Sequence, residues 1–223
     1  MGEVRSGKVS RGKSYPSLPD FITIPAWSRG AAPWCELSPM ILGPIQVFDP
    51  LPVRPGFSIT ADGKYAETIC NIFENYWQGS KIYNADILDP ANPLTIDNIK
   101  PAFWIRRARI FASAQPVRRA LPKAAYGYPI AGYYRGEIMD YVTSRNKVYA
   151  PTYYMLISTH PIFLQLCQLH KQGKNMIIAG PDGHNEHDPL TEAILDLMIN
   201  DPTRIFGHEL VLCAALLGKK YEY

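Results

Sequence analysis

The sequence predicts a mainly α fold of the α+β class, with minor β structure. Two observations lead to this expectation. Apolar residues recur with helical spacing in several segments beyond residue 65. Extended segments are few: short proline-rich runs within 19–60, and the apolar run MIIA at 176–179. A chain of 223 residues is long enough for one well-buried core. We therefore expect a single compact domain over 19–223, preceded by a flexible basic tail over 1–18.

Composition narrows the class of protein. Hydrophobic residues make up 47% and charged residues 19% of the chain, as in soluble globular proteins. The formal net charge of +3 excludes a polycation of the histone type. The four cysteines form no CxxC pair, which argues against a zinc ribbon and favours reduced, buried thiols. The chain has no secretory h-region and no apolar run of about 18 residues, so a cytoplasmic location is expected. We expect neither a metal ion nor a cofactor.

The basic tail allows two interpretations. Its first thirteen residues carry Arg5, Lys8, Arg11 and Lys13 against Glu3 alone. Such a segment is either a disordered terminus without a role or an arm that adds affinity for the phosphates of nucleic acid.

Several helices are expected along the remainder of the chain. In the first of them Ile69, Ile72, Phe73, Tyr76 and Tyr83 share one face. The Asp-Pro pairs at 188–189 and 201–202 are typical N-cap and N1 residues, so each predicts the start of a helix. The expected helices span 66–83, 103–114, 137–149, 152–173 with a break at 160–161, 188–199 and 202–218.

The polar side of the first helix carries an unusual stripe. Glu74, Trp77, Gln78 and Lys81 follow the spacing i, i+3, i+4 and i+7. The stripe is either a solvated face or a site. Two features favour a site: an exposed tryptophan ring needs a cover, and Gly79 costs a helix about 1 kcal/mol unless something approaches closely.

The pattern E-x-x-[aromatic]-Q-x-x-K in ENYWQGSK resembles the central motif of the NADAR family of YbiA-like N-glycosidases. Three further stretches are similar in character to that family: LSPMILGPIQVF at 37–48, THPIFLQLCQLHKQG at 159–173, and the pair GPDG at 180–183 and RIFGHELVLCAALLG at 204–218. The late R-x-x-G-H is also similar to uncharacterised phage and bacterial proteins that carry WQ-x-x-K. Where the family has W-G-x-G, this chain has IIAGPDG without a tryptophan.

The resemblance implies a YbiA-like helical domain that hydrolyses an N-glycosidic bond of a nucleotide-like or ADP-ribosylated substrate. Glu74 and Lys81 would be the catalytic groups, handling a sugar hydroxyl or proton and stabilising charge or attacking the anomeric carbon. Trp77 would stack on the substrate and Gln78 would hold a polar edge. The alternative is a module that binds a nucleotide, ADP-ribose or a nucleic acid without turnover, and such a module needs no amine with a lowered pKa. A structural protein that has kept the fold is a third possibility.

Other candidate residues lie outside the stripe. In FWIRRARIF, Trp104, Arg106 and Arg107 either clamp phosphate or cover apolar surface from a helix. Asp182 either orients a ribose hydroxyl or caps its own turn. Arg204 and His208, one helical turn apart, either contact substrate or anchor the last helix. The run HNEHD at 184–188 has no clear third ligand spacing, which favours a hydrogen-bonded loop over a metal site.

Overall fold

The computed structural model describes residues 1–9, 18–25, 33–47, 68–181, 183 and 189–222. These residues form an α+β structure in which helices predominate, as the sequence predicts. The chain divides into two compact units where the sequence predicted one domain. The first unit comprises Met1–Leu42 and Arg145–Tyr223, and the second comprises Gly43–Ser144.

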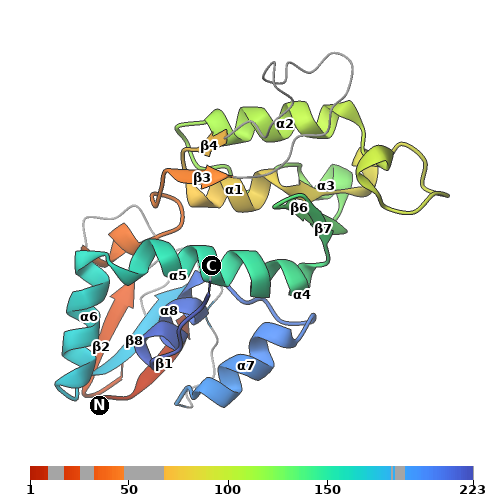
Figure 1. The fold of residues 1–223 in the computed structure, drawn as a ribbon. Helices are drawn as coiled ribbons and strands as arrows, with labels where there is room; N and C mark the ends of the chain where they lie inside the picture. Colours follow the sequence, from red (N-terminus) through yellow and green to blue (C-terminus); the bar gives the residue numbers. More distant parts are fainter. Residues whose placement is uncertain (10–17, 26–32, 48–67, 182, 184–188, 223) are drawn as a thin grey trace. The chain divides into compact units, whose positions relative to one another are not determined.

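The first unit is built on a parallel three-stranded sheet (Figure 1). The central strand β8 (Asn175–Gly180) lies between β1 (Val4–Lys8) and β2 (Phe21–Pro25). Strand β8 is the apolar run expected to be a strand, and it is buried along most of its length, as central parallel strands are. The flexible tail predicted over 1–18 is wrong for Val4–Lys8, because β1 pairs with β8 from Val4 opposite Met176 to Lys8 opposite Gly180. Residues 10–17 of that tail lie outside the described residues.

Helices cover this sheet. The last helix, α8 (His208–Leu216), is buried along its whole length and packs against β1, β8 and α5 (Ala150–Ser158). The π-helical segment η4 (Arg145–Tyr149) leads into α5, and α6 (Pro161–Lys171) packs on η1 (Pro33–Leu37). The break predicted at 160–161 is confirmed, since His160 caps α6. No helix among the described residues is long and apolar enough to cross a membrane.

Two predicted helix starts in the first unit are wrong. Helix α7 (Glu192–Asn200) is capped by Thr191, whose hydroxyl accepts from the Ile194 N–H. Helix α8 begins at His208, because Asp201 accepts hydrogen bonds from Thr203 and so closes a turn there. Arg204 therefore lies before the helix. The prediction that Arg204 and His208 are one helical turn apart is wrong.

A buried histidine makes the stability of this unit depend on pH. His170 in α6 is buried, and its Nδ1 has no hydrogen-bond partner within the described part of the chain. Burial, and then the charge of the N-terminus, lower the pKa of His170 from 6.5. Between that lowered value and 6.5 the unfolded chain binds more protons than the folded one, so stability is complete above pH 6.5 and falls as the pH decreases.

We expect the melting temperature to decrease below pH 6.5 and the decrease to be smaller in His170→Leu. Thermal melts of the wild type and the variant across that range measure the difference. His160→Gln, which changes the partly exposed histidine that caps α6, is the control and should keep the wild-type slope. Identical slopes for the wild type and His170→Leu would contradict the assignment.

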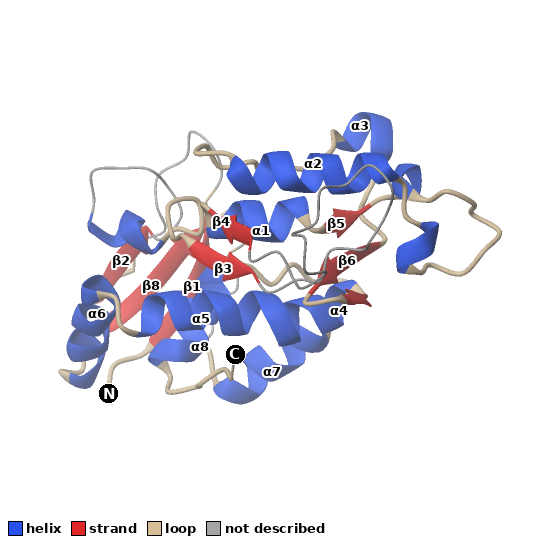
Figure 2. Cartoon of the chain, turned by 45° about the horizontal axis from the view of Figure 1, so that its top comes forward, coloured by secondary structure: helices blue, strands red, loops and turns tan. Residues whose placement is uncertain are grey.

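In the second unit a pair of helices packs beside small antiparallel sheets (Figure 2). Helices α1 (Phe73–Gly79) and α2 (Pro101–Ala112) lie side by side. The sequence prediction of a helix over 103–114 is confirmed with a shift of two residues, since Pro101 occupies N1. The remaining strands and α-helices are β3 (Ile45–Val47), β4 (Thr68–Cys70), β5 (Lys81–Ile82), α3 (Lys123–Tyr126), β6 (Ala131–Tyr134), β7 (Glu137–Met139) and α4 (Tyr141–Ser144). Two short 3₁₀ helices, η2 (Asn84–Asp86) and η3 (Ile96–Asn98), also belong to this unit.

The helix predicted over 66–83 is much shorter than expected. Its first part forms β4, which pairs antiparallel with β3. Its last part forms β5, in which Lys81 pairs with Gly132 of β6. Strand pairing at both ends therefore overrides a helical periodicity that only 73–79 follow. The helix predicted over 137–149 is likewise wrong for Glu137–Met139, which forms β7 against β6.

Gly79, the last residue of α1, lies against α2. A Cβ added at Gly79 would lie 3.0 Å from the Phe111 ring and 3.1 Å from an Ile110 methyl group. From the sequence, close approach of either another backbone or a ligand could explain a glycine at this position. The structure assigns it to packing between the two helices.

Candidate functional site

The stripe in ENYWQGSK does not face solvent. Every residue of α1 is buried, and Glu74, Trp77 and Gln78 are each 9% exposed or less. The alternative that the stripe is a solvated face is therefore wrong for Glu74, Trp77 and Gln78. A buried carboxylate and a buried amide need polar partners, because their desolvation is costly.

Three of the four stripe residues form one hydrogen-bond chain. The Gln78 Nε2 donates to Glu74 Oε1 at 2.8 Å, and the Lys81 Nζ donates to Gln78 Oε1 at 2.9 Å. The amide thus joins a buried carboxylate to an amine that is partly exposed at the start of β5. Because the donor and acceptor ends of Gln78 are both used, its side chain has one orientation in this chain.

Trp77 is held by packing within the second unit. Its ring stacks on Tyr134 with centroids 5.4 Å apart and an interplanar angle of 19°. The Tyr134 hydroxyl also donates to the Trp77 carbonyl at 3.0 Å. The cover that an otherwise exposed ring requires is therefore Tyr134. The Lys81 Nζ lies 5.2 Å from the Trp77 ring centroid, so the ring favours the charged amine at that position.

Asn75, within the same motif, is a buried anchor that the sequence analysis missed. Its Nδ2 donates to the carbonyls of Ser113 and Gln115, and its Oδ1 accepts from the Val117 N–H at 2.7 Å. One side chain therefore ties the segment that follows α2 to α1. The sequence gives no indication of this role, because the three hydrogen-bond partners of Asn75 lie about 40 residues away.

Removing this anchor should loosen the segment after α2. We expect Asn75→Ala to lower the free energy of unfolding by about 2–3 kcal/mol, because three hydrogen bonds are lost and buried backbone groups remain unpaired. Urea denaturation measures the change. Asn92→Ala, which removes an exposed hydrogen bond to Asp89 in the same unit, is the control and should change it by less than about 1 kcal/mol. An Asn75→Ala loss as small as the control's would show that the anchor contributes little.

Arg106 is paired internally. Its two terminal nitrogens donate to the two carboxylate oxygens of Asp86 at 2.7 and 2.8 Å, a bidentate ion pair. The same guanidinium donates to the Lys81 carbonyl at 3.3 Å. The predicted role as a phosphate clamp is therefore wrong for the arrangement in this structure. Instead, Arg106 fixes the backbone that carries Lys81, and Asp86 is a second residue that the sequence analysis missed.

Trp104 and Arg107 are core side chains, which corrects their prediction as substrate-binding residues. Trp104 belongs to an apolar cluster of the second unit. Arg107 is buried, lies 4.3 Å over the Phe111 ring and donates to Ser80 Oγ at 3.3 Å. The cluster consists of Ile82, Ile87, Ile99, Phe103, Trp104 and Tyr133.

The other candidates belong to the first unit. Asp182 and the HNEHD run at 184–188 lie outside the described residues. Arg204 is exposed and lies 3.4 Å from an Asp201 carboxylate oxygen, while the buried His208 has its Nδ1 3.3 Å from Glu209 Oε2. No group of three or more His, Cys, Asp or Glu side chains that could hold a metal ion occurs among the described residues.

Glu209, which the sequence analysis missed, lies at the carboxyl end of the central strand of the first unit. A Cβ at Gly180 would meet its carboxylate at 1.7 Å, so only glycine fits there. Burial, and then the charge of Glu209, raise the pKa of both Tyr153 and Cys213 well above their usual values. Both groups therefore stay protonated at neutral pH.

The two units thus hold separate polar arrangements, and the hydrogen-bond chain of the second unit contains both residues predicted to be catalytic. Its function has to be argued from these side chains. The chain matches no protein-family model, no curated protein and no solved structure.

Proposed function

We propose that the protein is an N-glycoside hydrolase that acts on a nucleotide-like or ADP-ribosylated substrate. The observation that supports it is the chain from Glu74 through Gln78 to Lys81. It supplies a carboxylate on the buried helix α1 and a partly exposed amine at the start of β5, joined through Gln78. Cleavage of a glycosidic bond uses a proton acceptor and a proton donor, and a carboxylate and an ammonium group can take these two roles. The resemblance of ENYWQGSK to the NADAR motif supports the same substrate class.

The chemistry assigns one role to each end of the chain. Glu74 accepts a proton from a water molecule whose oxygen bonds to the anomeric carbon. The bond between that carbon and the base nitrogen breaks, and the departing nitrogen takes a proton from the Lys81 ammonium. Proton transfer from Glu74 to Lys81 through solvent then restores both groups, so the net change is addition of one water molecule.

The neighbouring residues position these groups. Gln78 sets the separation of the carboxylate and the amine, and Trp77 lies beside the amine. Arg106 holds the Lys81 carbonyl while its charge is compensated by Asp86. Four side chains from α1, η2 and α2 thus fix the position of Lys81, as the precise placement of a reacting group requires.

Ligand-induced stabilisation tests the proposal. ADP-ribose, NAD and nucleoside monophosphates are added at millimolar concentration to the wild type, to Lys81→Ala and to the control Lys171→Ala, which changes an exposed lysine of α6. At a ligand concentration of 100 Kd, we expect the wild type and the control to gain about 2.7 kcal/mol of stability and Lys81→Ala to gain much less. If none of these ligands stabilises the wild type, the proposal is wrong.

A further inference from the structure

Positive charge is concentrated in one stretch of the second unit. No aspartate or glutamate occurs between Asp97 and Glu137. The same stretch contains eight basic residues, although the whole chain has a net charge of only +3. These residues are Lys100, Arg106, Arg107, Arg109, Arg118, Arg119, Lys123 and Arg135. A local excess of this size attracts anions over a distance set by the ionic strength.

Part of this charge serves the fold, and part faces solvent. Lys100 donates to the Ala85 carbonyl, while Arg106 and Arg107 make the internal contacts described above. The other five are exposed: Arg109, Arg118, Arg119 and Lys123, which lie from α2 to the start of α3, and Arg135 further along the chain. The exposed charges are those that a ligand can reach.

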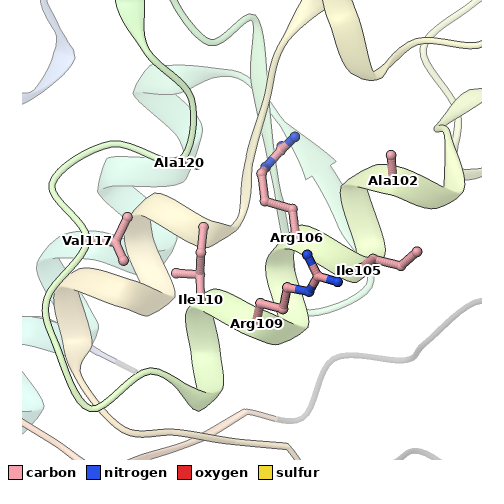
Figure 3. A pocket seen from close by; sticks show the side chains of 7 residues that line it. All are labelled: Ala102, Ile105, Arg106, Arg109, Ile110, Val117 and Ala120. Carbon is pink, nitrogen blue, oxygen red and sulfur yellow. The ribbon is translucent and has the colours of Figure 1, made fainter.

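A hollow of about 340 Å³ lies between α2 and the segment 117–120 (Figure 3). Its lining contains five apolar residues and two arginines, Arg106 and Arg109. In Figure 3 both arginines rise from α2, while Val117 and Ala120 lie on the opposite segment. Because Asp86 compensates the charge of Arg106, the cation of this lining is Arg109, and an apolar lining beside it suits a ligand that has both an apolar part and an anionic part.

Two exposed tyrosines follow Lys123 in the same stretch of the chain. Tyr126 is 44% exposed and Tyr128 is 67% exposed. Lys123 donates to the Tyr128 hydroxyl and lies 4.2 Å from its ring centroid. The hydrogen bond and charge of Lys123, together with the charge of Arg119, lower the pKa of Tyr128, so Arg119 acts on this ring as well. Aromatic rings among cations are typical of surfaces that stack unpaired bases.

The position of this segment is fixed in part by α1. Asn75 binds residues 113–117 directly, just before the two arginines. Burial raises the pKa of Tyr83, whereas a backbone hydrogen bond with Leu121 and the charges of Arg106 and Arg119 lower it. Arg106 of α2 and Arg119 of the segment therefore lie near the same ring. Arg118 and Arg119 therefore directly follow a segment that hydrogen bonds tie to α1.

We propose that the second unit binds single-stranded nucleic acid on this surface, the basic face, made of Arg109, Arg118, Arg119, Lys123, Tyr126 and Tyr128. The guanidinium and ammonium groups contact phosphates, and unpaired bases stack on the two rings. A base pair in a duplex has no free face for such stacking, which favours single strands. The inference does not depend on the hydrolase activity, because none of these six residues belongs to the chain from Glu74 to Lys81.

Fluorescence anisotropy with labelled single-stranded oligo(dT) and oligo(rU) tests the basic face. Arg118→Gln/Arg119→Gln removes two exposed cations, and Lys171→Gln/Lys174→Gln removes two exposed cations from the first unit as a matched control. For the first double variant we expect the slope of log K against log salt to become shallower by about 1.4. The control should keep the wild-type slope, and a comparison of the two oligonucleotides distinguishes RNA from DNA as the ligand.

Base stacking is tested separately. Tyr128→Ala should weaken oligonucleotide binding by at least about fivefold, whereas binding of duplex DNA should be weaker in the wild type and unaffected by this variant. Circular dichroism melts check that the variants, all at exposed positions, keep the wild-type fold. Lys81→Ala should bind oligonucleotide as tightly as the wild type, even where it has lost its response to ADP-ribose.

Three results would overturn the inference. The first is no binding of oligonucleotide by the wild type at low salt, and the second is an equal loss in the control double variant. The third is binding to phosphatidylserine vesicles without binding to oligonucleotides, which would assign the basic face to a membrane surface. Because Lys81→Ala separates the two functions, failure of the hydrolase proposal leaves this test intact.

Discussion

Replacement of Arg145 by methionine is expected to lower the free energy of unfolding by about 3–5 kcal/mol. Arg145 is the largest fully buried side chain in the described part of the chain. Its guanidinium donates to four backbone carbonyls, those of Met198, Ile199, Asp201 and Arg204. The first two belong to the last turn of α7, where the carbonyl groups have no N–H partner four residues further along the helix, and the Met198 carbonyl also accepts from the Asp201 N–H at 3.4 Å.

The effect should be large because one cation satisfies several acceptors at once. A guanidinium near the carboxyl end of α7 also interacts favourably with the helix dipole. Methionine fills part of the volume but donates no hydrogen bond, so buried carbonyls are left unpaired at about 1–3 kcal/mol each. Arg145→Lys keeps the charge and loses the planar fork, so its loss should be intermediate.

Urea denaturation of three variants measures these differences. Asn146→Ala is the matched control at the next position along the chain. The Asn146 side chain is partly exposed and donates one solvent-exposed hydrogen bond to Asn200 Oδ1 at 3.0 Å. This variant should cost less than about 1 kcal/mol. If Arg145→Met were no less stable than Asn146→Ala, the carbonyl contacts would not stabilise α7 and the segment that follows it.

The elements that the sequence predicts well are those whose packing agrees with their local pattern. Helix α2 has proline at N1 and a continuous apolar face, and β8 is an apolar run bounded by Asn175 and Gly180. The segment 66–83 has a helical pattern too, yet Lys81 pairs with Gly132 across about 50 residues. Such long-range pairing leaves no mark in a single sequence, because either partner could pair elsewhere.

Predictions for side chains failed for a related reason. Glu74 and Gln78 meet as the helical spacing implies, but Lys81 reaches Gln78 from a strand. Arg106 looked available because its partner, Asp86, lies 20 residues away at the end of η2. Arg145 has no helical signal that distinguishes it from its neighbours, and its acceptors lie more than 50 residues along the chain. Sequence spacing thus identifies neighbours within an element, whereas tertiary partners decide which charges serve the fold.

Glu74→Gln is expected to lower kcat for hydrolysis of an N-glycoside by about 10²–10⁴-fold with little change in KM. The glutamine is nearly isosteric and can still accept the hydrogen bond from Gln78, so the fold and the position of Lys81 should be kept. It cannot take a proton from water, which is the step proposed for the carboxylate. Release of free base, followed by chromatography, measures the rate.

The dependence of kcat on pH separates this role from a merely structural one. Loss of a general base should remove the acid limb of the profile in Glu74→Gln. Glu137→Gln, which changes an exposed glutamate of β7 in the same unit, should match the wild type in kcat and in pH profile. Lys81→Ala should lower kcat as well, because the departing base loses its proton donor, and it should affect substrates whose base is a poor leaving group most strongly. If Glu74→Gln kept full activity with an unchanged acid limb, the carboxylate would be a packing element of α1, and the chemistry would have to be sought in other residues.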